Sequence, residues 1–149
     1  MALTYSFLDV NAAISGPGGN FQIGQGAGVS AEGVVIAPTG DKNVMLVGAD
    51  GEVMHSLLAD KSGTLTVNVL KTSETNANLQ DLYNFQTASA ANHGQNSIVL
   101  THNPTGDVIT CNQAAFKNMP THTYAQEGGI TTWVFDVGKI DVKLGRGAN

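Results

Sequence analysis

The sequence has few charged side chains for its length. Only 13% of its 149 residues are Asp, Glu, Lys or Arg, which is about half the share of roughly 25% that is usual in soluble domains. Monomeric proteins use charge to keep their surfaces hydrated and apart from one another. The shortage of charge, beside 18 glycines, favours a protein whose surface is largely covered by other protein. The alternative is a monomer that short polar side chains keep in solution.

Cysteine is almost absent. Cys111 is the one cysteine in the chain, so no disulfide can form within it, and nothing indicates an oxidising compartment. It stands in a strand-like run at residues 108–111, whereas a nucleophilic thiol needs a neighbouring base and a positively charged setting. We therefore expect Cys111 to lie in the core.

Basic residues are also scarce, and they are scattered. Seven Lys and Arg stand against twelve Asp and Glu, which gives a formal net charge of -5. Tight binding of nucleic acid needs clustered cations, so the sequence argues against it, although DNA can pass an acidic surface without adhering. No apolar run approaches the roughly 20 residues of a membrane helix, and the basic start of a signal peptide is lacking. We expect no membrane partner, and a protein used in the cytosol or exported without a Sec-type signal.

One segment changes its hydrophobic period. The apolar positions of residues 64–70 alternate with polar ones, as in a strand with one buried face; they are Leu65, Val67 and Val69. The apolar positions that follow recur at steps of three and four, and they are Leu79, Leu82, Tyr83 and the uncharged Gln86. This period predicts one helix over about residues 75–88, capped by Thr72, Ser73 or Thr75.

Short strands and glycine turns fill the remainder. We expect strands at residues 4–13, 21–23, 33–38 and 140–144, and hairpins that pair 44–47 with 53–58, 97–102 with 107–116, and 121–126 with 131–137. Asp-Gly and Gly-Gly supply the positive φ of tight turns. Strands joined by hairpins make an antiparallel sheet. The predicted fold is therefore mainly β, a single domain over residues 1–149 in which an antiparallel β-barrel or sandwich carries one packed α-helix.

The residues that carry chemistry form no catalytic or metal-binding pattern. Four histidines stand in different predicted elements without metal-like spacing; they are His55, His93, His102 and His122. The glycines at 24–28 precede a strand rather than the helix that a phosphate-binding loop needs, and Ser62 lacks the context of a nucleophile elbow. Trp133 and Phe135, at strand spacing, indicate core or subunit contact rather than a sugar platform. We expect no cofactor, no metal and no enzymatic activity.

Motifs along nearly the whole chain, in order and at matching spacing, resemble the small structural proteins of contractile-tailed bacteriophages. They are TYSFLDVN at 4–11, GADG at 48–51, MHSL at 54–57, ADKSGT at 59–64, QTAS at 86–89, GQN at 94–96, GDVI at 106–109, YA at 124–125 before EGG at 127–129, and WVF at 133–135. On these motifs the chain resembles the tail tube proteins of such phages, a family similar to the type VI secretion tube protein. The motifs are structural signatures and name no catalytic residue.

The resemblance implies a fold, an assembly and partners. The implied fold is the tail-tube type of β-barrel with one helix. The implied assembly is a hexameric ring, and these rings stack into a hollow tube inside a contractile sheath. Genomic DNA would pass through the lumen without specific binding. The implied partners are tail sheath, baseplate and tail terminator proteins, and the implied location is the virion tail, assembled in the host bacterial cytoplasm.

Two turn-rich segments are our candidates for a subunit or ring-stacking interface. The first belongs to the glycine-rich stretch at 16–28 and the second surrounds residues 41–51. The residues predicted to take part are Gly16, Gly18, Gly19, Asp41, Lys42, Asn43, Asp50 and Gly51. The family motifs do not mark any residue as part of an interface. We expect these loops to become ordered when rings stack.

Other interpretations stay open at this point. A β-sandwich binding module for a glycan or a host surface would expose aromatic side chains on a groove. A tail terminator, or a tube subunit of a bacteriocin or secretion device, would share the fold. A small hydrolase would need His93 and His102 to come together with an acidic residue.

Overall fold

The computed structural model describes residues 4–145. Its elements follow one another in the order η1 (Phe7–Asp9), β1 (Val10–Gly16), β2 (Gly19–Gln22), β3 (Val29–Pro38), β4 (Asn43–Val47), β5 (Val53–Leu57), β6 (Gly63–Leu70), α1 (Glu74–Thr87), β7 (Asn96–His102), β8 (Asp107–Phe116) and β9 (Ile130–Lys143). The prediction of a mainly β chain with one α-helix is confirmed.

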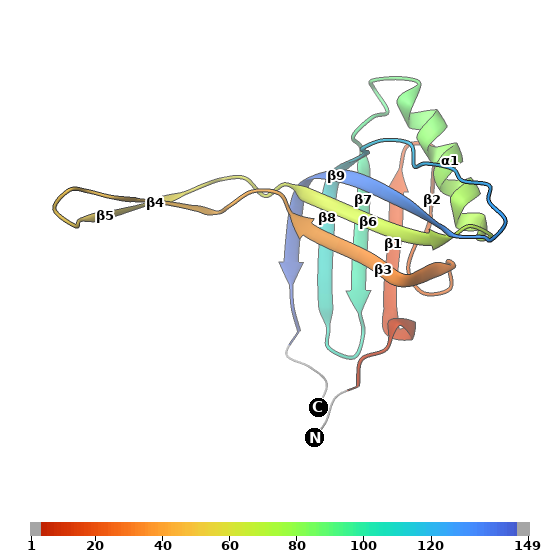
Figure 1. The fold of residues 1–149 in the computed structure, drawn as a ribbon, viewed down its shortest axis with the longest axis horizontal. Helices are drawn as coiled ribbons and strands as arrows, with labels where there is room; N and C mark the ends of the chain where they lie inside the picture. The colour runs from red at the N-terminus through yellow and green to blue at the C-terminus, as the bar shows by residue number, and fades with distance from the viewer. Residues whose placement is uncertain (1–3, 146–149) are drawn as a thin grey trace.

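Seven of the strands form one antiparallel sheet in the order β2-β1-β7-β8-β9-β6-β3. The sheet curls into a half-barrel, so that β3 and β6 cross over β1, β7 and β8 (Figure 1). The half-barrel does not close, because β2 and β3 are its edges and each pairs on one side only among residues 4–145. β4 and β5 form a separate two-stranded sheet.

The core lies between the inner face of this sheet and α1. The alternation predicted for β6 is confirmed, because Leu65, Val67 and Val69 are fully buried. Trp133 and Phe135 on the neighbouring strand β9 are fully buried as well, so they are core residues rather than an exposed platform. Side chains at spacing 2 on the strands thus build one continuous apolar layer.

Helix α1 begins where two hydroxyl groups anchor it. The Ser73 hydroxyl caps the helix by accepting a hydrogen bond from the Thr75 amide at 3.1 Å, which satisfies one of the free donors of the first turn. Ser73 and Thr75 both donate to the carbonyl oxygen of Ala27 at 2.7 Å. The cap therefore also fixes the loop between β2 and β3.

The other end of α1 is held by a buried pair of amides. Gln86 and Asn96, both almost fully buried, exchange two hydrogen bonds of 2.7 Å, and Gln86 also donates to the carbonyl oxygen of Pro17 at 3.0 Å. A Cβ on Gly16 would lie 2.0 Å from the Asn96 amide oxygen, so only glycine leaves room for the pair. These contacts join α1, β7 and the β1–β2 turn.

Two predicted strands are wrong, for identifiable reasons. Residues 4–13 do not form one strand, because Ser6 accepts from the Leu8 amide and starts the short helix η1, so β1 begins only at Val10. Residues 121–126 form no strand. Their predicted partner, residues 131–137 of β9, pairs with β6 along its whole length and from Phe135 onward with β8 as well, so only the few residues before Phe135 have a side without a strand.

Two other strands are longer than predicted. β3 starts at Val29 and passes Gly33, which has φ +69 and lies where the register with β6 shifts. β9 includes the predicted strand at 140–144 as a continuation of residues 131–137. It passes Gly138, where an added Cβ would lie 2.9 Å from the Gln113 amide oxygen. Glycine in these strands allows a bulge or a close contact instead of ending the strand.

Replacing Gln86 by Leu should destabilise the fold by about 1–3 kcal/mol, because it leaves the buried Asn96 amide and the Pro17 carbonyl without their partner. Urea unfolding followed by circular dichroism measures the change. The matched control is Gln95→Leu at an exposed position, which should change the free energy of unfolding by less than about 0.5 kcal/mol. Equal stabilities of the two variants would show that the amide pair does not hold α1.

Candidate assembly interface

The hairpin of β4 and β5, called the arm from here on, projects from the half-barrel (Figure 1). Its strands pair from Asn43 with Leu57 at the base to Val47 with Val53 near the tip. At the base, the carbonyl oxygen of Lys42 accepts a hydrogen bond from the Leu58 amide at 2.9 Å. The ammonium group of Lys42 donates to the Leu58 carbonyl oxygen at 2.7 Å. The turn closes at Gly51, whose φ is +90. The predicted hairpin is confirmed.

Both faces of the arm are apolar and exposed. One face carries Met45, Val47, Val53 and Leu57, and the other carries Val44, Leu46 and Met54. Each of these side chains is between 51% and 87% exposed. A lone two-stranded hairpin is at best marginally stable in water, and contiguous exposed apolar surface marks an interaction site. The arm therefore needs a surface outside its own chain.

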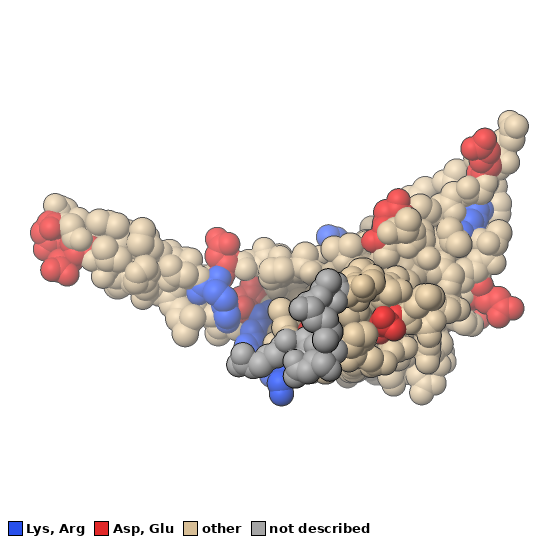
Figure 2. All heavy atoms as spheres, turned by 90° about the horizontal axis from the view of Figure 1, so that it is seen from below, with Lys and Arg blue, Asp and Glu red and all other residues tan. Residues whose placement is uncertain are grey.

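Charge on the arm is confined to its ends. Acidic residues gather at the tip, and both acidic and basic residues lie near the base (Figure 2). Asp50 at the tip accepts from the Glu52 amide at 3.1 Å. Beyond the base, the Ser62 hydroxyl and amide hold the pKa of Asp60 below its usual value. The apolar stem thus stands between two polar ends.

The edges of the half-barrel are a second candidate surface. The outer side of β2 and that of β3 carry backbone groups that pair with no strand among the described residues. Such edges template pairing with another chain unless they are blunted. The bulge at Gly33 interrupts one part of β3, whereas its regular part, which pairs Val34 to Pro38 with β6, remains a suitable template.

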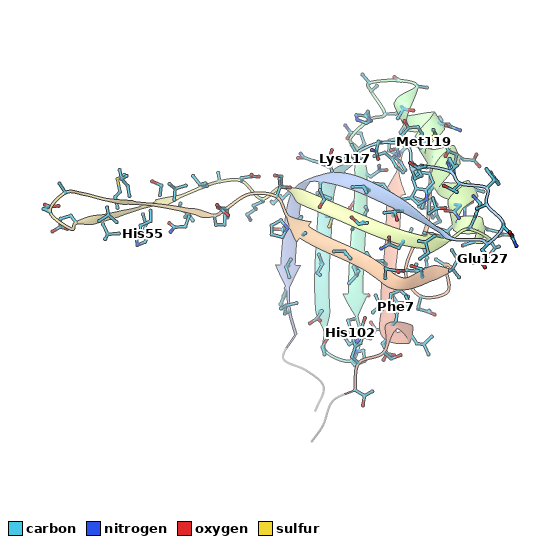
Figure 3. All side chains as sticks on the ribbon, in the orientation of Figure 1. Phe7, His55, His102, Lys117, Met119 and Glu127 are labelled. Atoms are coloured by element: carbon cyan, nitrogen blue, oxygen red, sulfur yellow. The ribbon has the colours of Figure 1, made fainter. Side chains whose placement is uncertain are left out.

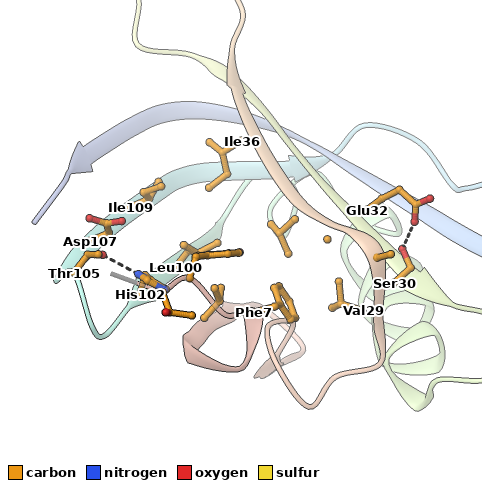
Figure 4. Close-up of a pocket in the computed structure, with 16 residues that line it drawn as sticks. Phe7, Val29, Ser30, Glu32, Ile36, Leu100, His102, Thr105, Asp107 and Ile109 are labelled. Carbon is orange, nitrogen blue, oxygen red and sulfur yellow. Dashed lines mark hydrogen bonds between the residues drawn. The ribbon is translucent and has the colours of Figure 1, made fainter. Parts of the chain in front are cut away.

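A cavity of about 800 Å³ opens under the curled sheet, beside the β7–β8 turn (Figure 4). Most of its wall is apolar and comes from η1, β1, β3, β7 and β8; the apolar lining includes Phe7, Val10, Val29, Val34, Ile36, Leu100 and Ile109. Its polar lining includes Ser30, Glu32, His102, Thr105 and Asp107. The Ser30 hydroxyl donates to Glu32 at 2.6 Å and holds the pKa of Glu32 below its usual value.

His102 is the buried polar group of this cavity. It is only 7% exposed, its Nδ1 lies 2.8 Å from the Thr105 hydroxyl, and the Tyr5 ring lies 5.3 Å away between centroids. Its Nε2 is buried and has no hydrogen-bond partner among residues 4–145. A buried polar atom without a partner is costly.

The histidines do not assemble into a catalytic or metal site. His93 precedes β7, and His102 is the last residue of that strand. The Nδ1 atom of His55 on the arm lies 3.1 Å from the side-chain amide nitrogen of Asn43. The Nε2 atom of His122 lies 2.9 Å from the side-chain amide oxygen of Gln80. Within residues 4–145 no three His, Cys, Asp or Glu side chains gather as metal ligands would. In the same part of the chain no helix is long and apolar enough to span a membrane.

The predicted interface residues fall into two groups. Asp41, Lys42, Asn43, Asp50 and Gly51 are exposed at the base and the tip of the arm. The other group lies at the β1–β2 turn. Gly16 packs against the Gln86–Asn96 amide pair, and a Cβ added to Gly18 would lie 2.7 Å from the Phe85 ring. Gly19 faces open space. Gly16 and Gly18 thus serve the packing of α1 inside the chain.

Sequence reasoning missed the apolar stem of the arm. The prediction for residues 44–47 and 53–58 is an ordinary hairpin, although their sequence lacks the alternation of a strand that has one face in solvent. A signal was present: two consecutive apolar strands between an Asp-Lys-Asn base and an Asp-Gly turn. The cavity has no such signal, because its wall comes from elements far apart in the sequence.

Comparison with known proteins points to one family. The family described as "Bacteriophage PhiTE tail tube protein" matches residues 1–145. No curated protein sequence matches the chain.

Solved structures share the fold at low sequence identity. The sheath/tube terminator of the extracellular contractile injection system PVC in the extended state has a TM-score of 0.58 and 10% identity, over 95% of this chain and 98% of that one. The PVC sheath-tube complex has a TM-score of 0.54 and 11% identity, over 89% and 88%. The structure of the anti-feeding prophage (AFP) baseplate has a TM-score of 0.55 and 12% identity, over 97% of each chain.

Leu46→Ala on the arm should leave the stability of dilute protein nearly unchanged, within about 0.5 kcal/mol, because Leu46 is 62% exposed. Leu65→Ala makes the same change at a fully buried position and should cost about 2–5 kcal/mol. Urea unfolding of both variants measures the difference. A cost at Leu46 close to that at Leu65 would mean that the chain buries its own arm in solution.

Cys111 should not react with a maleimide while the protein is folded. The thiol is fully buried, and burial raises its pKa to about 11, so near about pH 8 it stays protonated and unreactive. Mass spectrometry of labelled protein should show modification only in denaturant. Rapid, complete labelling of the native protein would contradict the core position.

Proposed function

The chain belongs to the bacteriophage PhiTE tail tube protein family and is a structural subunit of a phage tail tube; on this premise we propose that its copies close into hexameric rings that stack into a hollow tube. In this proposal genomic DNA passes through the lumen. The family implies a component of the virion tail and suggests a non-enzymatic role.

The observation that carries the proposal is the exposed apolar arm. Its stem has seven apolar side chains that are at least half exposed, which is unfavourable in a monomer. A tube supplies a neighbour for every arm, because the same heterologous contact repeats from subunit to subunit. The exposed residues Asp41, Lys42, Asn43, Asp50 and Gly51 then lie at the margins of the contact.

Ring closure follows from the two edges of the half-barrel. In our proposal the edge of β3 in one copy meets a sheet edge of the next copy, so that the sheets continue around the ring. A closed ring of sheets removes the unpaired edges, which is how barrels avoid aggregation. Gly19 at the open turn of β2 is the glycine of the β1–β2 turn that remains free to take part.

The charge of the chain suits passage of DNA rather than its binding. Six copies would carry six times the formal charge of -5, which is -30 per ring. Like charge repels the phosphates, and without clustered cations the DNA gains no counterion release from binding. The proposed lumen therefore lets a polyanion slide.

The proposed partners are tail sheath, baseplate and tail terminator proteins, with assembly in the host bacterial cytoplasm. The similar solved structures come from a sheath-tube complex, a terminator and a baseplate, and their likeness to this chain is one of fold. A glycan-binding module is less well supported. The exposed aromatic residues within 4–145, which are Tyr5, Phe85 and Tyr124, come from three separate segments.

Negative-stain electron microscopy of the purified protein across a concentration series tests the proposal. We expect rings and hollow tubes of uniform diameter from the wild type. Replacing Leu46 and Met54 by Ser on one face of the arm should abolish the tubes, because it removes apolar area that only a neighbouring copy buries.

The control exchanges the same two residues as Leu46→Met and Met54→Leu, which keeps the apolar area and should keep the tubes. Single rings without long tubes would favour a terminator instead. Tubes formed equally well by the Ser variant, or a wild type that is monomeric at every concentration, would contradict assembly through the arm.

A further inference from the structure

The apolar stem of the arm carries methionine, whose polarity can change by a chemical reaction. The methionines of the stem are Met45 and Met54, which are 56% and 55% exposed. Exposure leaves a thioether open to dissolved oxidants, whereas the aliphatic side chains beside it are inert to them. The arm therefore holds two positions at which an oxidant can alter an otherwise apolar surface.

The two methionines lie on opposite faces of the arm. Met45 pairs with His55, and Met54 pairs with Leu46. Directly paired residues of an antiparallel ribbon share a face, and successive residues of one strand alternate between faces. Oxidation of both methionines consequently places a polar group on each face of the stem, and neither face stays as it was.

The reaction is the oxidation of a thioether by a peroxide. The sulfur atom gives two electrons, the O–O bond of hydrogen peroxide breaks, and a bond forms between sulfur and one oxygen atom. The second oxygen atom leaves as water with both protons. The product, methionine sulfoxide, is polar and chiral. Methionine sulfoxide reductases reverse the change with two thiols, which become a disulfide while the oxygen atom leaves as water.

A sulfoxide on the stem opposes its burial. The new oxygen atom is a hydrogen-bond acceptor, and the apolar side chains around it offer no donor. Burial of a polar group without a hydrogen bond is unfavourable, whereas water satisfies the same group on a free arm. The fold of the subunit is not affected, because the core cluster contains no residue of the arm.

One other methionine among residues 4–145 is exposed to peroxide. Met119 is 51% exposed, and it lies beside α1, on the other side of the half-barrel from the arm, where His55 is labelled (Figure 3). The Cys111 thiol and the Trp133 ring are fully buried. Met119 therefore serves as an internal control that matches the arm in exposure and differs from it in place.

We propose that Met45 and Met54 form a reversible oxidation site that controls assembly. A peroxide converts them to sulfoxides in the free subunit, the arm then no longer packs on a second copy, and reduction restores it. A packed arm shields its thioethers, so the oxidant acts on the chain before assembly. The inference rests on the proposed tube function and adds a chemical signal to which assembly responds.

Partial oxidation of the wild-type protein tests this site without any substitution. Dilute protein is treated with a limiting dose of hydrogen peroxide, the peroxide is removed with catalase, and the protein is concentrated for assembly. Sedimentation separates assembled from free subunits, and peptide mass spectrometry gives the fraction of sulfoxide at each methionine in both. We expect this fraction to be several-fold lower in assembled than in free subunits at Met45 and Met54, and equal in both at Met119. Equal fractions at the two arm positions, or the same depletion at Met119, would overturn the inference.

Permanent polar replacements give a second, independent measurement. Met45→Gln together with Met54→Gln should raise the protein concentration at which tubes appear several-fold, whereas Met119→Gln, the matched control, should leave it unchanged. An unaltered unfolding midpoint by circular dichroism shows that each variant is folded. Tubes that form as readily from the double variant as from Met119→Gln would contradict the site.

Reduction tests the reversibility. Free subunits that carry sulfoxides are treated with both methionine sulfoxide reductases and dithiothreitol, and complete reduction is checked by mass spectrometry. We expect them to assemble again. Subunits that stay free after complete reduction would refute reversible control.

Electron microscopy of the untreated and treated samples separates this inference from the tube proposal. Tubes that incorporate the sulfoxides freely would refute the oxidation site and leave the tube standing. Association of the untreated protein into particles that are neither rings nor tubes, with the same exclusion of sulfoxides, would support the site and refute the tube. Untreated protein that is monomeric at every concentration would refute both.

Discussion

A two-stranded ribbon exposes two faces, and the arm is apolar on both of them. Every stem side chain except His55, Ser56 and Asn43 is apolar, yet the seven apolar ones stay at least half exposed. To bury these side chains, the same chain would need further residues packed on the faces of the arm, and residues 4–145 supply none. The free energy that would stabilise this surface is therefore available only through contact with other protein.

The half-barrel is organised to leave that contact open. Its core is complete without the arm, because α1 closes one end of the inner face through the Gln86–Asn96 pair and the Ser73 cap. The other end remains hollow, with an apolar wall that includes Leu100 and Ile109. The core of the subunit thus resides in the half-barrel, whereas the arm is a separate two-stranded sheet.

Prediction from the sequence succeeded where the signal is local. The period of β6, the helix from Glu74 to Thr87 and the Asp-Gly turn of the arm all follow from neighbouring residues. It failed at residues 121–126, because their polar alternation and following glycines suit a strand, whereas pairing depends on which edges remain free. The interface role of Gly16 stays a prediction, and inside the chain its small size makes room for the buried amides of Gln86 and Asn96.

By itself, the sequence determined the mainly β class, the single amphipathic helix, the core position of Cys111 and the resemblance to tail tube proteins, since these depend on period, composition and motif order. Only the tertiary structure decided that the arm stands away from the sheet with both faces exposed. It also decided that Val34, Leu100 and His102 line one cavity. The reason is physical: burial depends on which distant segments pack together, and a sequence pattern does not specify which side of an apolar strand finds a partner.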